Sequence, residues 1–169
     1  FNFSATYLHG IGLSSGLFFT IYAIVNGGSR IGGGGLSDRF GRAVVIIPTL
    51  LLFTLGLMLD SVTRGNALMV TAALCIGLGF GMANPTILAQ LLDRADRSEQ
   101  GRIIGGFYFC YQIGTLCAAP LFGVVADALG YPAMWQLGGS IVLLGVLVYA
   151  WVEVRRGRAS TAAAADSAG

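Results

Sequence analysis

The stretch Gly34-Gly35-Leu36-Ser37-Asp38-Arg39-Phe40-Gly41 recurs 89 residues later as Gly123-Val124-Val125-Ala126-Asp127-Ala128-Leu129-Gly130. Both copies fit the pattern Gly-x-aliphatic-small-Asp-x-apolar-Gly, and each joins two apolar segments through a tight turn. The same offset pairs Gly16, Phe18 and Tyr22 with Gly105, Phe107 and Tyr111. Three expected membrane crossings separate equivalent residues of the two copies. Because three is an odd number, the chain runs in opposite directions through the membrane in the two copies. The sequence therefore predicts an inverted repeat, in which the second copy lies upside down in the membrane relative to the first.

The composition is typical of a membrane protein. Hydrophobic residues make up 55% of the 169 residues and charged residues only 11%, whereas globular proteins have about 25% charged residues. The net charge is +2, and all ten basic residues are arginines. Cys75, Cys110 and Cys117 lie inside apolar segments without metal-ligand spacing, so we interpret them as small membrane-buried residues.

Five apolar segments are long enough to cross a bilayer, since a crossing needs roughly 20 residues. They cover 13–36, 43–59, 67–92, 103–126 and 132–152. Residues 1–152 are thus predicted to form one all-α transmembrane helix bundle. We predict that residues 153–169, which become Arg-rich and then small and polar, form a disordered tail. The first repeat lacks its leading helix, and a further span before Phe1 is the simplest completion.

Arginine placement predicts the orientation, because basic residues near span ends stay on the cytoplasmic side. Alternate connections after the first span carry eight arginines against one in the others, Arg64. The eight are Arg39, Arg42, Arg94, Arg97, Arg102, Arg155, Arg156 and Arg158. We therefore expect the Phe1 side to be external and the tail to be cytoplasmic. Asp60 is assigned to the external connection 60–66, and no acidic residue lies in the middle of a span.

The first turn now suggests a family. Gly34-x-Leu36-Ser37-Asp38-Arg39-Phe40-Gly41-Arg42 closely resembles the signature loop of the major facilitator superfamily, although Ala43 stands where a second basic residue is common. The resemblance implies five spans of a twelve-helix transporter, namely helices eight to twelve of its C-terminal half, similar to bacterial drug and sugar efflux members. It also implies that Gly34, Asp38, Arg39, Gly41 and Arg42 form a gating loop that latches the cytoplasmic side. The alternative is a charged turn that only holds the orientation.

Polar side chains recur at helical spacing within the spans and are candidates for lining a solute cavity. Such groups are costly when they face lipid, so they should face the bundle interior or water. The alternative is hydrogen bonding between packed helices. The candidates are Tyr22, Asn26 and Arg30 in the first span, Asn84 and Gln90 in the third, and Tyr108, Tyr111, Gln112 and Thr115 in the fourth.

Two of these candidates carry further expectations. Arg30 is the only ionised group well inside a span, so it either binds an anionic substrate, reaches the headgroups, or pairs with an acid elsewhere in the protein. Asn84-Pro85 follows Gly77-x-Gly79-x-Gly81. This pattern suits either a kinked helix that moves as a gate or a glycine face for close packing.

No enzyme signature survives scrutiny. Gly12-Leu13-Ser14-Ser15-Gly16 fits a hydrolase nucleophile pattern, but no strand precedes it and the only histidine, His9, lies upstream. Asp93, Asp96 and Glu99 alternate with arginines, so a solvated charged loop is a better interpretation than a metal site. We expect no catalytic residue, metal, cofactor or nucleic-acid partner.

Together these patterns predict secondary active transport of a small solute by alternating access, with proton-coupled efflux as the first choice. An organic-anion exchanger, an uptake symporter and a non-transporting receptor or scaffold of the same fold are the alternatives. The expected partners are the solute, protons, the lipid bilayer of the plasma (inner) membrane, and a missing N-terminal half of the same protein. A proton-carrying carboxylate, if used, should lie in that absent half.

Overall fold

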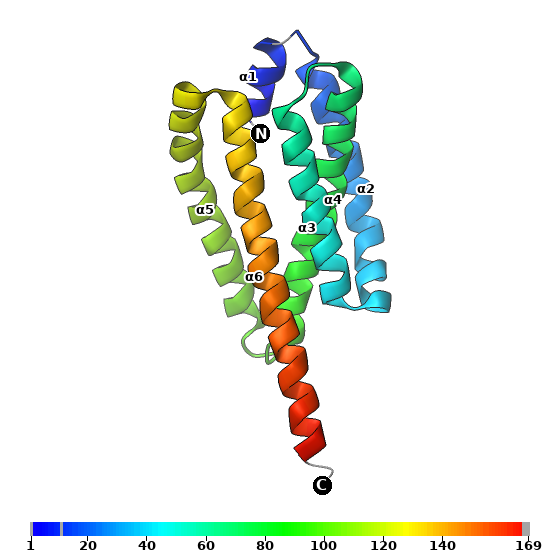
Figure 1. Ribbon diagram of the computed structural model, residues 1–169. Helices are drawn as coiled ribbons and strands as arrows, with labels where there is room; N and C mark the ends of the chain where they lie inside the picture. The colour runs from blue at the N-terminus through cyan, green and yellow to red at the C-terminus, as the bar shows by residue number, and fades with distance from the viewer. Residues whose placement is uncertain (1, 11, 167–169) are drawn as a thin grey trace.

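The computed structural model describes residues 2–10 and 12–166, which are helical apart from short turns and contain no strand. This confirms the all-α fold class. The helices are α1 (Asn2–Gly10), α2 (Ser15–Phe40), α3 (Arg42–Ser61), α4 (Asn66–Asp93), α5 (Gln100–Leu129) and α6 (Tyr131–Asp166). The five long helices run alternately up and down side by side (Figure 1). The short helix α1, which the sequence analysis did not predict, lies across one end of this bundle.

The two turns of the sequence repeat have the same backbone geometry. Gly41 separates α2 from α3 with φ 91° and ψ 145°, and Gly130 separates α5 from α6 with φ 85° and ψ 165°. Each glycine N–H donates to the carbonyl four residues earlier, at 3.1 Å on Ser37 and 3.0 Å on Ala126. Only glycine adopts a positive φ without strain, so a single residue ends one helix and starts the next. The turns lie at opposite ends of the bundle (Figure 1), as the inverted repeat predicted.

Helix α4 lies at the centre and packs closely on both α2 and α3 through its glycines. A Cβ at Gly79 would lie 2.5 Å from the Phe53 backbone nitrogen of α3, and one at Gly77 would lie 3.1 Å from Val25 of α2. A Cβ at Gly81 would collide with Ser29 of α2. The glycine run is therefore a packing surface on two sides of one helix, which was one of the two alternatives from the sequence.

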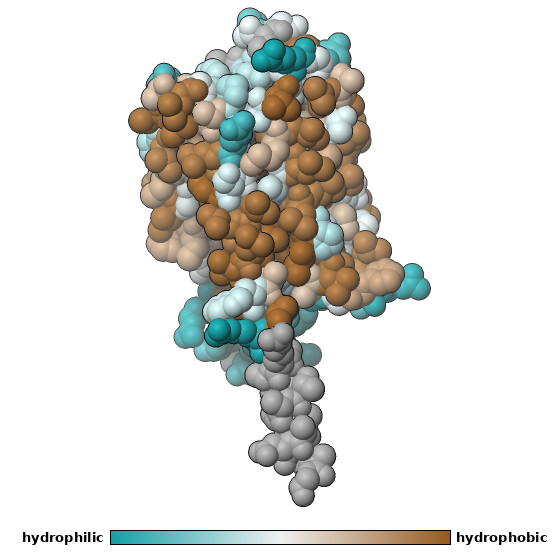
Figure 2. Space-filling model, viewed as in Figure 1, coloured by the Kyte–Doolittle hydropathy of each residue, from teal (hydrophilic) through white to brown (hydrophobic). Residues whose placement is uncertain are grey.

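The face of the bundle seen in Figure 2 is mostly apolar in its middle and has polar residues towards both ends. Within the described residues, four helices are long and apolar enough to cross a membrane: α3, α4, α5 and residues Tyr131–Arg155 of α6. The predicted first span, now α2, is not among them, because Asn26, Ser29, Arg30 and its glycines lower its hydropathy. With 26 residues it is still about 39 Å long at 1.5 Å per residue, and it lies alongside α4 (Figure 1).

The predicted disordered tail needs a correction. Helix α6 does not end near Val152 but continues to Asp166, while residues 167–169 lie outside the described part of the chain. The physical reason is helix propensity. Alanines dominate residues 159–165, and adding residues to an existing helix avoids the cost of nucleation.

Candidate gating network and polar face

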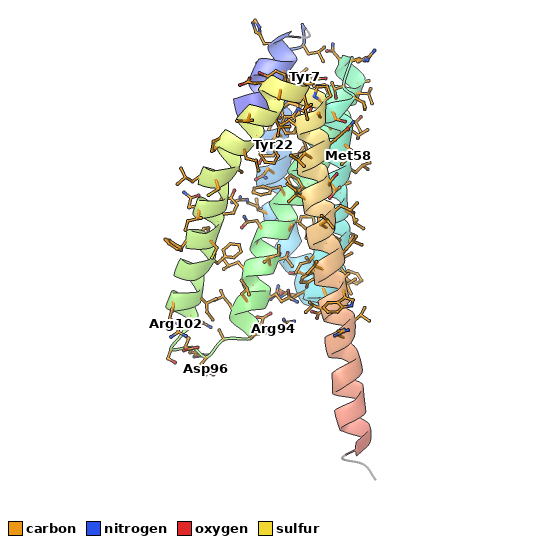
Figure 3. All side chains as sticks on the ribbon, turned by 60° about the vertical axis from the view of Figure 1, so that its left-hand side comes forward. Tyr7, Tyr22, Met58, Arg94, Asp96 and Arg102 are labelled. Atoms are coloured by element: carbon orange, nitrogen blue, oxygen red, sulfur yellow. The ribbon has the colours of Figure 1, made fainter. Side chains whose placement is uncertain are left out.

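One end of the bundle, which we call the arginine-rich end, carries Arg39, Arg42, Arg94, Arg97 and Arg102. Figure 3 shows Arg94, Asp96 and Arg102 at this end and Tyr7 at the opposite, α1 end. The repeat turn with Gly41 belongs to the arginine-rich end, because α2 ends there and α3 begins there.

Arg42 is the centre of a charged network at this end. Its Nη1 lies 2.7 Å from Asp38 Oδ1 of α2, and its Nε donates to Asp93 Oδ2 of α4 at 2.9 Å. The same Nη1 donates to the Ser37 hydroxyl at 2.6 Å. The turn at Gly41 makes this possible, since it places the last turn of α2 next to the first residue of α3. One guanidinium thereby ties α2, α3 and α4 together.

Two further side-chain contacts extend the network to α6. Arg94 Nη2 lies 3.4 Å from Glu153 Oε1, and the Tyr149 hydroxyl donates to Gln90 Oε1 at 2.8 Å. A cavity of about 340 Å³ lies at this end, and five residues of the network line it: Arg42, Gln90, Asp93, Arg94 and Glu153. We call the whole set the Arg42 network; it comprises Ser37, Asp38, Arg42, Gln90, Asp93, Arg94, Tyr149 and Glu153.

The network changes the interpretation of several residues. Gln90, a candidate for lining the solute cavity, lines the cavity at this end and accepts a hydrogen bond from Tyr149 of α6. Asp93 was assigned to a solvated loop, but it is the last residue of α4 and pairs with Arg42. Of the five predicted gating-loop residues, Asp38 and Arg42 belong to the network, Gly41 forms the turn that brings them together, and Arg39 is exposed. The surroundings of Gly34 lie outside what the structure describes.

The sequence analysis missed Tyr149 and Glu153 because they fall at the predicted end of the last span. A carboxylate four residues after a tyrosine on a helix was a usable signal, since both side chains then lie on one face. The sequence does not show which helix packs against this face of α6.

The polar face of α2 is partly assembled. The Asn26 amide donates to the Tyr22 hydroxyl at 3.2 Å. Tyr22 and Tyr111 of α5 are equivalent residues of the repeat. Tyr22 and Asn26 are half-buried and face the side of the bundle on which α5 stands apart from α2.

The matching residues of α5 are open to the surroundings. Tyr108, Tyr111, Gln112 and Thr115 are all exposed, and the Thr115 hydroxyl donates within its own helix to the Tyr111 carbonyl at 2.9 Å. In the whole of α5 only Ala126 is buried. This polar stripe is thus available to a solute, to water or to another part of the protein.

Arg30 and Asn84 complete the candidates. Arg30 is exposed, and none of the described residues forms an ion pair or hydrogen bond with it. Asn84 is half-buried on α4, one residue before Pro85, and α4 continues as a helix through this proline. The structure therefore leaves Arg30 on a side of α2 that its described neighbours do not cover.

The enzyme-like serine motif has a structural role. Ser14 is the N-cap of α2, and its hydroxyl accepts a hydrogen bond from the Leu17 N–H at 3.3 Å. This is the ordinary use of a serine at a helix start. Over the described residues, no group of three or more histidine, cysteine or acidic side chains is arranged to hold a metal ion.

Comparison with known proteins agrees with the resemblance. The family model of the Major Facilitator Superfamily matches residues 1–168. The chain is 30% identical over 121 residues to the 3-(3-hydroxy-phenyl)propionate transporter of Escherichia coli (strain K12), covering 71% of this chain and 30% of that protein. It is 25% identical over 136 residues to the myo-inositol transporter FST1 of Gibberella moniliformis, covering 75% of this chain and 23% of that protein.

A third relative is the proton myo-inositol cotransporter hmit-1.2 of Caenorhabditis elegans, 26% identical over 120 residues, with 69% of this chain and 20% of that protein covered. No solved structure matches. The chain thus spans between a fifth and a third of the length of these relatives. Because the family model covers nearly every residue, and the repeat, the turn and the helical bundle all agree with it, this chain belongs to the Major Facilitator Superfamily.

Proposed function

We propose that the protein containing this chain moves a small solute across the membrane by alternating access, coupled to protons. The family membership and the transporter relatives support transport as the function class over catalysis. The Arg42 network is the observation that carries the mechanism, because it joins helices of both repeats at a single end of the bundle.

The network has the properties of a latch. Alternating access requires contacts that hold one end closed and can be broken at low cost. The ion pairs of Arg42 and Arg94 are partly exposed, and each such pair is worth up to about 1 kcal/mol. Several together stabilise a closed state without locking it. With the arginine-rich end on the cytoplasmic side, as the positive-inside rule indicates, this latch closes the cytoplasmic side of an outward-facing state.

The solute would bind along the polar face formed by Tyr22, Asn26 and the exposed stripe of α5. That stripe would face the other half of the transporter, which the relatives' greater length accommodates. Proton-coupled efflux from the plasma membrane remains the direction proposed from the sequence. The proton cotransporter relative favours a second candidate, uptake of a solute together with protons.

Flux measurements on the full-length protein in liposomes test the proposal. Radiolabelled myo-inositol and 3-(3-hydroxyphenyl)propionate are suitable first solutes, because relatives carry these names. We expect accumulation only when a pH gradient is imposed, and its sign distinguishes uptake from efflux. Flux that ignores the pH gradient would remove the proton coupling. Binding without flux for every solute tried would favour a receptor of the same fold.

The latch is tested separately by Asp38→Asn, with Asp96→Asn as the matched control. Asp96 is an exposed acid at the same end that forms none of the network contacts. We expect Asp38→Asn to reduce the transport rate at equal amounts of membrane-inserted protein and Asp96→Asn to leave it unchanged. Equal rates for the two variants would show that Asp38 is only part of a turn.

A further inference from the structure

The α1 end of the bundle contains a buried acid. Asp60 is the penultimate residue of α3, and its side chain is 0% exposed. Neither carboxylate oxygen has a hydrogen-bond partner among the described residues. Asp60 was expected in the external connection 60–66, whereas the structure places it inside α3.

Burial decides which form of this acid is stable. An ionised carboxylate loses its hydration on burial, and no hydrogen bond from the described residues replaces that hydration at Asp60. The neutral carboxyl avoids most of this cost. A closed α1 end therefore favours a protonated Asp60, and an α1 end open to water favours an ionised Asp60.

Helix α1 covers this region. The Tyr7 hydroxyl donates to the carbonyl of Thr63 at 3.1 Å, and the Tyr7 ring lies 5.7 Å from the ring of Tyr131 at the start of α6. Burial raises the pKa of Tyr7, the charge of Asp60 raises it further, and the charge of Arg64 lowers it. Asp60 and Tyr7 therefore lie close to each other at this end of the bundle.

The other titratable groups near this contact are few. Arg64 in the following turn is exposed, as is His9 at the end of α1. The first turns of α2 and α4, which also pack on α3, contain no titratable side chain. A cavity of about 130 Å³, lined by Ser4, Leu57 and Trp135 among others, lies one helical turn from Asp60. The buried Trp135 Nε1 beside it has no hydrogen-bond partner among the described residues.

The repeat supplies an independent argument. At the 89-residue offset, Asp60 of α3 is equivalent to Tyr149 of α6, whose hydroxyl donates to Gln90 and ties α6 to α4 at the arginine-rich end. A neutral carboxyl carries an O–H donor, as a phenol does, whereas an ionised carboxylate is an acceptor only. Protonated Asp60 would carry at the α1 end the same kind of O–H donor that Tyr149 carries at the other, although none of the described residues accepts a hydrogen bond from it.

We propose that Asp60 is a proton-binding site that controls closure of the α1 end. The carboxyl holds a proton while α1 packs over the end of α3. When α1 moves away, the O–H bond breaks, the proton passes to water at that end, and the carboxylate remains ionised until α1 closes again. A proton fits better than a metal ion, because the described residues place no group of acidic ligands around Asp60. The inference rests on the proposed function only for its place in a transport cycle.

Cysteine accessibility of the purified full-length protein tests the proposal. Thr63→Cys, in a background where Cys75, Cys110 and Cys117 are serine and other cysteines are removed, places a thiol at a residue that is 0% exposed beneath α1. The maleimide labelling rate is measured against pH and divided by the rate of the unfolded protein at the same pH. This division removes the titration of the thiol itself.

With Asp60 intact, we expect the normalised rate to rise by up to about tenfold per pH unit, the limit for linkage to one proton. Asp60→Asn, which imitates the neutral form, should give a slow rate that does not depend on pH. The matched control is Asp127→Asn, an exposed acid at the same end, and it should behave like the parent. A pH dependence that survives Asp60→Asn would overturn the proposal.

Infrared difference spectra provide a readout that a purely structural role would not produce. The carbonyl band of a protonated carboxyl should appear on acidification, persist in Asp127→Asn and vanish in Asp60→Asn. Asp60→Glu keeps an acid and should retain a shifted band, which guards against misfolding of the asparagine variant. No such band in the parent at any pH would also overturn the proposal. If labelling and spectra behave as expected but no solute is transported, the proposed function fails while this inference stands.

Discussion

Replacing Asp93 by asparagine is the sharpest test of the Arg42 network. The change keeps the size of the side chain and leaves an oxygen that can still accept a hydrogen bond from Arg42 Nε, now 2.9 Å from Asp93 Oδ2. It removes one negative charge. Any effect therefore reports the electrostatic part of the contact between α3 and α4.

The expected magnitude follows from exposure and geometry. The side chains of Arg42 and Asp93 are 24% and 54% exposed, so the pair is weakened by solvent and is worth about 0.5–1 kcal/mol. A loss of that size raises the ratio of open to closed molecules about two- to fivefold. Arg42→Gln also removes the contacts with Asp38 and Ser37. We therefore expect about 1–2 kcal/mol for it, with incomplete additivity because the contacts share one guanidinium.

The assay is maleimide labelling of Val45→Cys in the purified full-length protein without other cysteines. Val45 is buried, 5% exposed, one turn along α3 from Arg42, so its labelling rate follows the open population. We expect the rate to rise two- to fivefold in Asp93→Asn and further in Arg42→Gln. High salt should reduce the difference between parent and Asp93→Asn, because the Debye length falls to about 3 Å at 1 M.

Asp96→Asn is the control for a general change of charge at the same end. Its labelling rate should equal that of the parent. If Asp93→Asn and Asp96→Asn label at the same rate, the Arg42–Asp93 pair does not hold this end closed, and the latch argument is refuted.

Three further predictions concern packing, charge and orientation. Gly79→Ala should cost about 1–3 kcal/mol of stability and lower the unfolding temperature, because its Cβ would lie 2.5 Å from the Phe53 nitrogen. Gly105→Ala is the control, since nothing lies within 4 Å of its added Cβ, and it should not lower the unfolding temperature. Equal unfolding temperatures for the two variants would show that Gly79 is not needed for close packing. Arg30→Lys should keep transport if Arg30 reaches headgroups or a protein acid, whereas loss of solute binding in both Arg30→Lys and Arg30→Gln, with folding intact, would place Arg30 on an anionic solute. An impermeant thiol reagent applied to intact cells should label Ala128→Cys and spare Phe40→Cys, and the reverse pattern would invert the predicted orientation.

The repeat and its turn show how far local sequence information reaches. Gly41 and Gly130 could be predicted as turns because a one-residue connection between two helices requires a positive φ, and that requirement acts on the residue itself. The family and the fold class followed from the same short motif and from helix-length apolar runs. Asp38 and Arg42 could be paired for a similar reason, since they lie four residues apart across the turn.

The rest depended on which helix lies next to which. A helix face is visible in the sequence, but its neighbour is not, so the hydrogen bond from the Tyr149 hydroxyl to Gln90 could not be predicted. Asp93 looked like a solvated charge because its partner, Arg42, is 51 residues away. Asp60 looked like a loop residue because the burial of its side chain depends on packing between helices that the sequence does not place next to each other.

By itself, then, the sequence determined the presence of the five long helices, the repeat with its two glycine turns, and the superfamily, because each of these is specified by residues close together in the chain. Only the tertiary structure decided that Arg42 joins three helices, that α5 leaves its polar stripe exposed and that Asp60 is buried without a hydrogen-bond partner among the described residues. The physical reason is that ion pairing and burial depend on distances between residues of different helices, and the packing of the glycine-rich helix α4 against α2 and α3 fixes those distances.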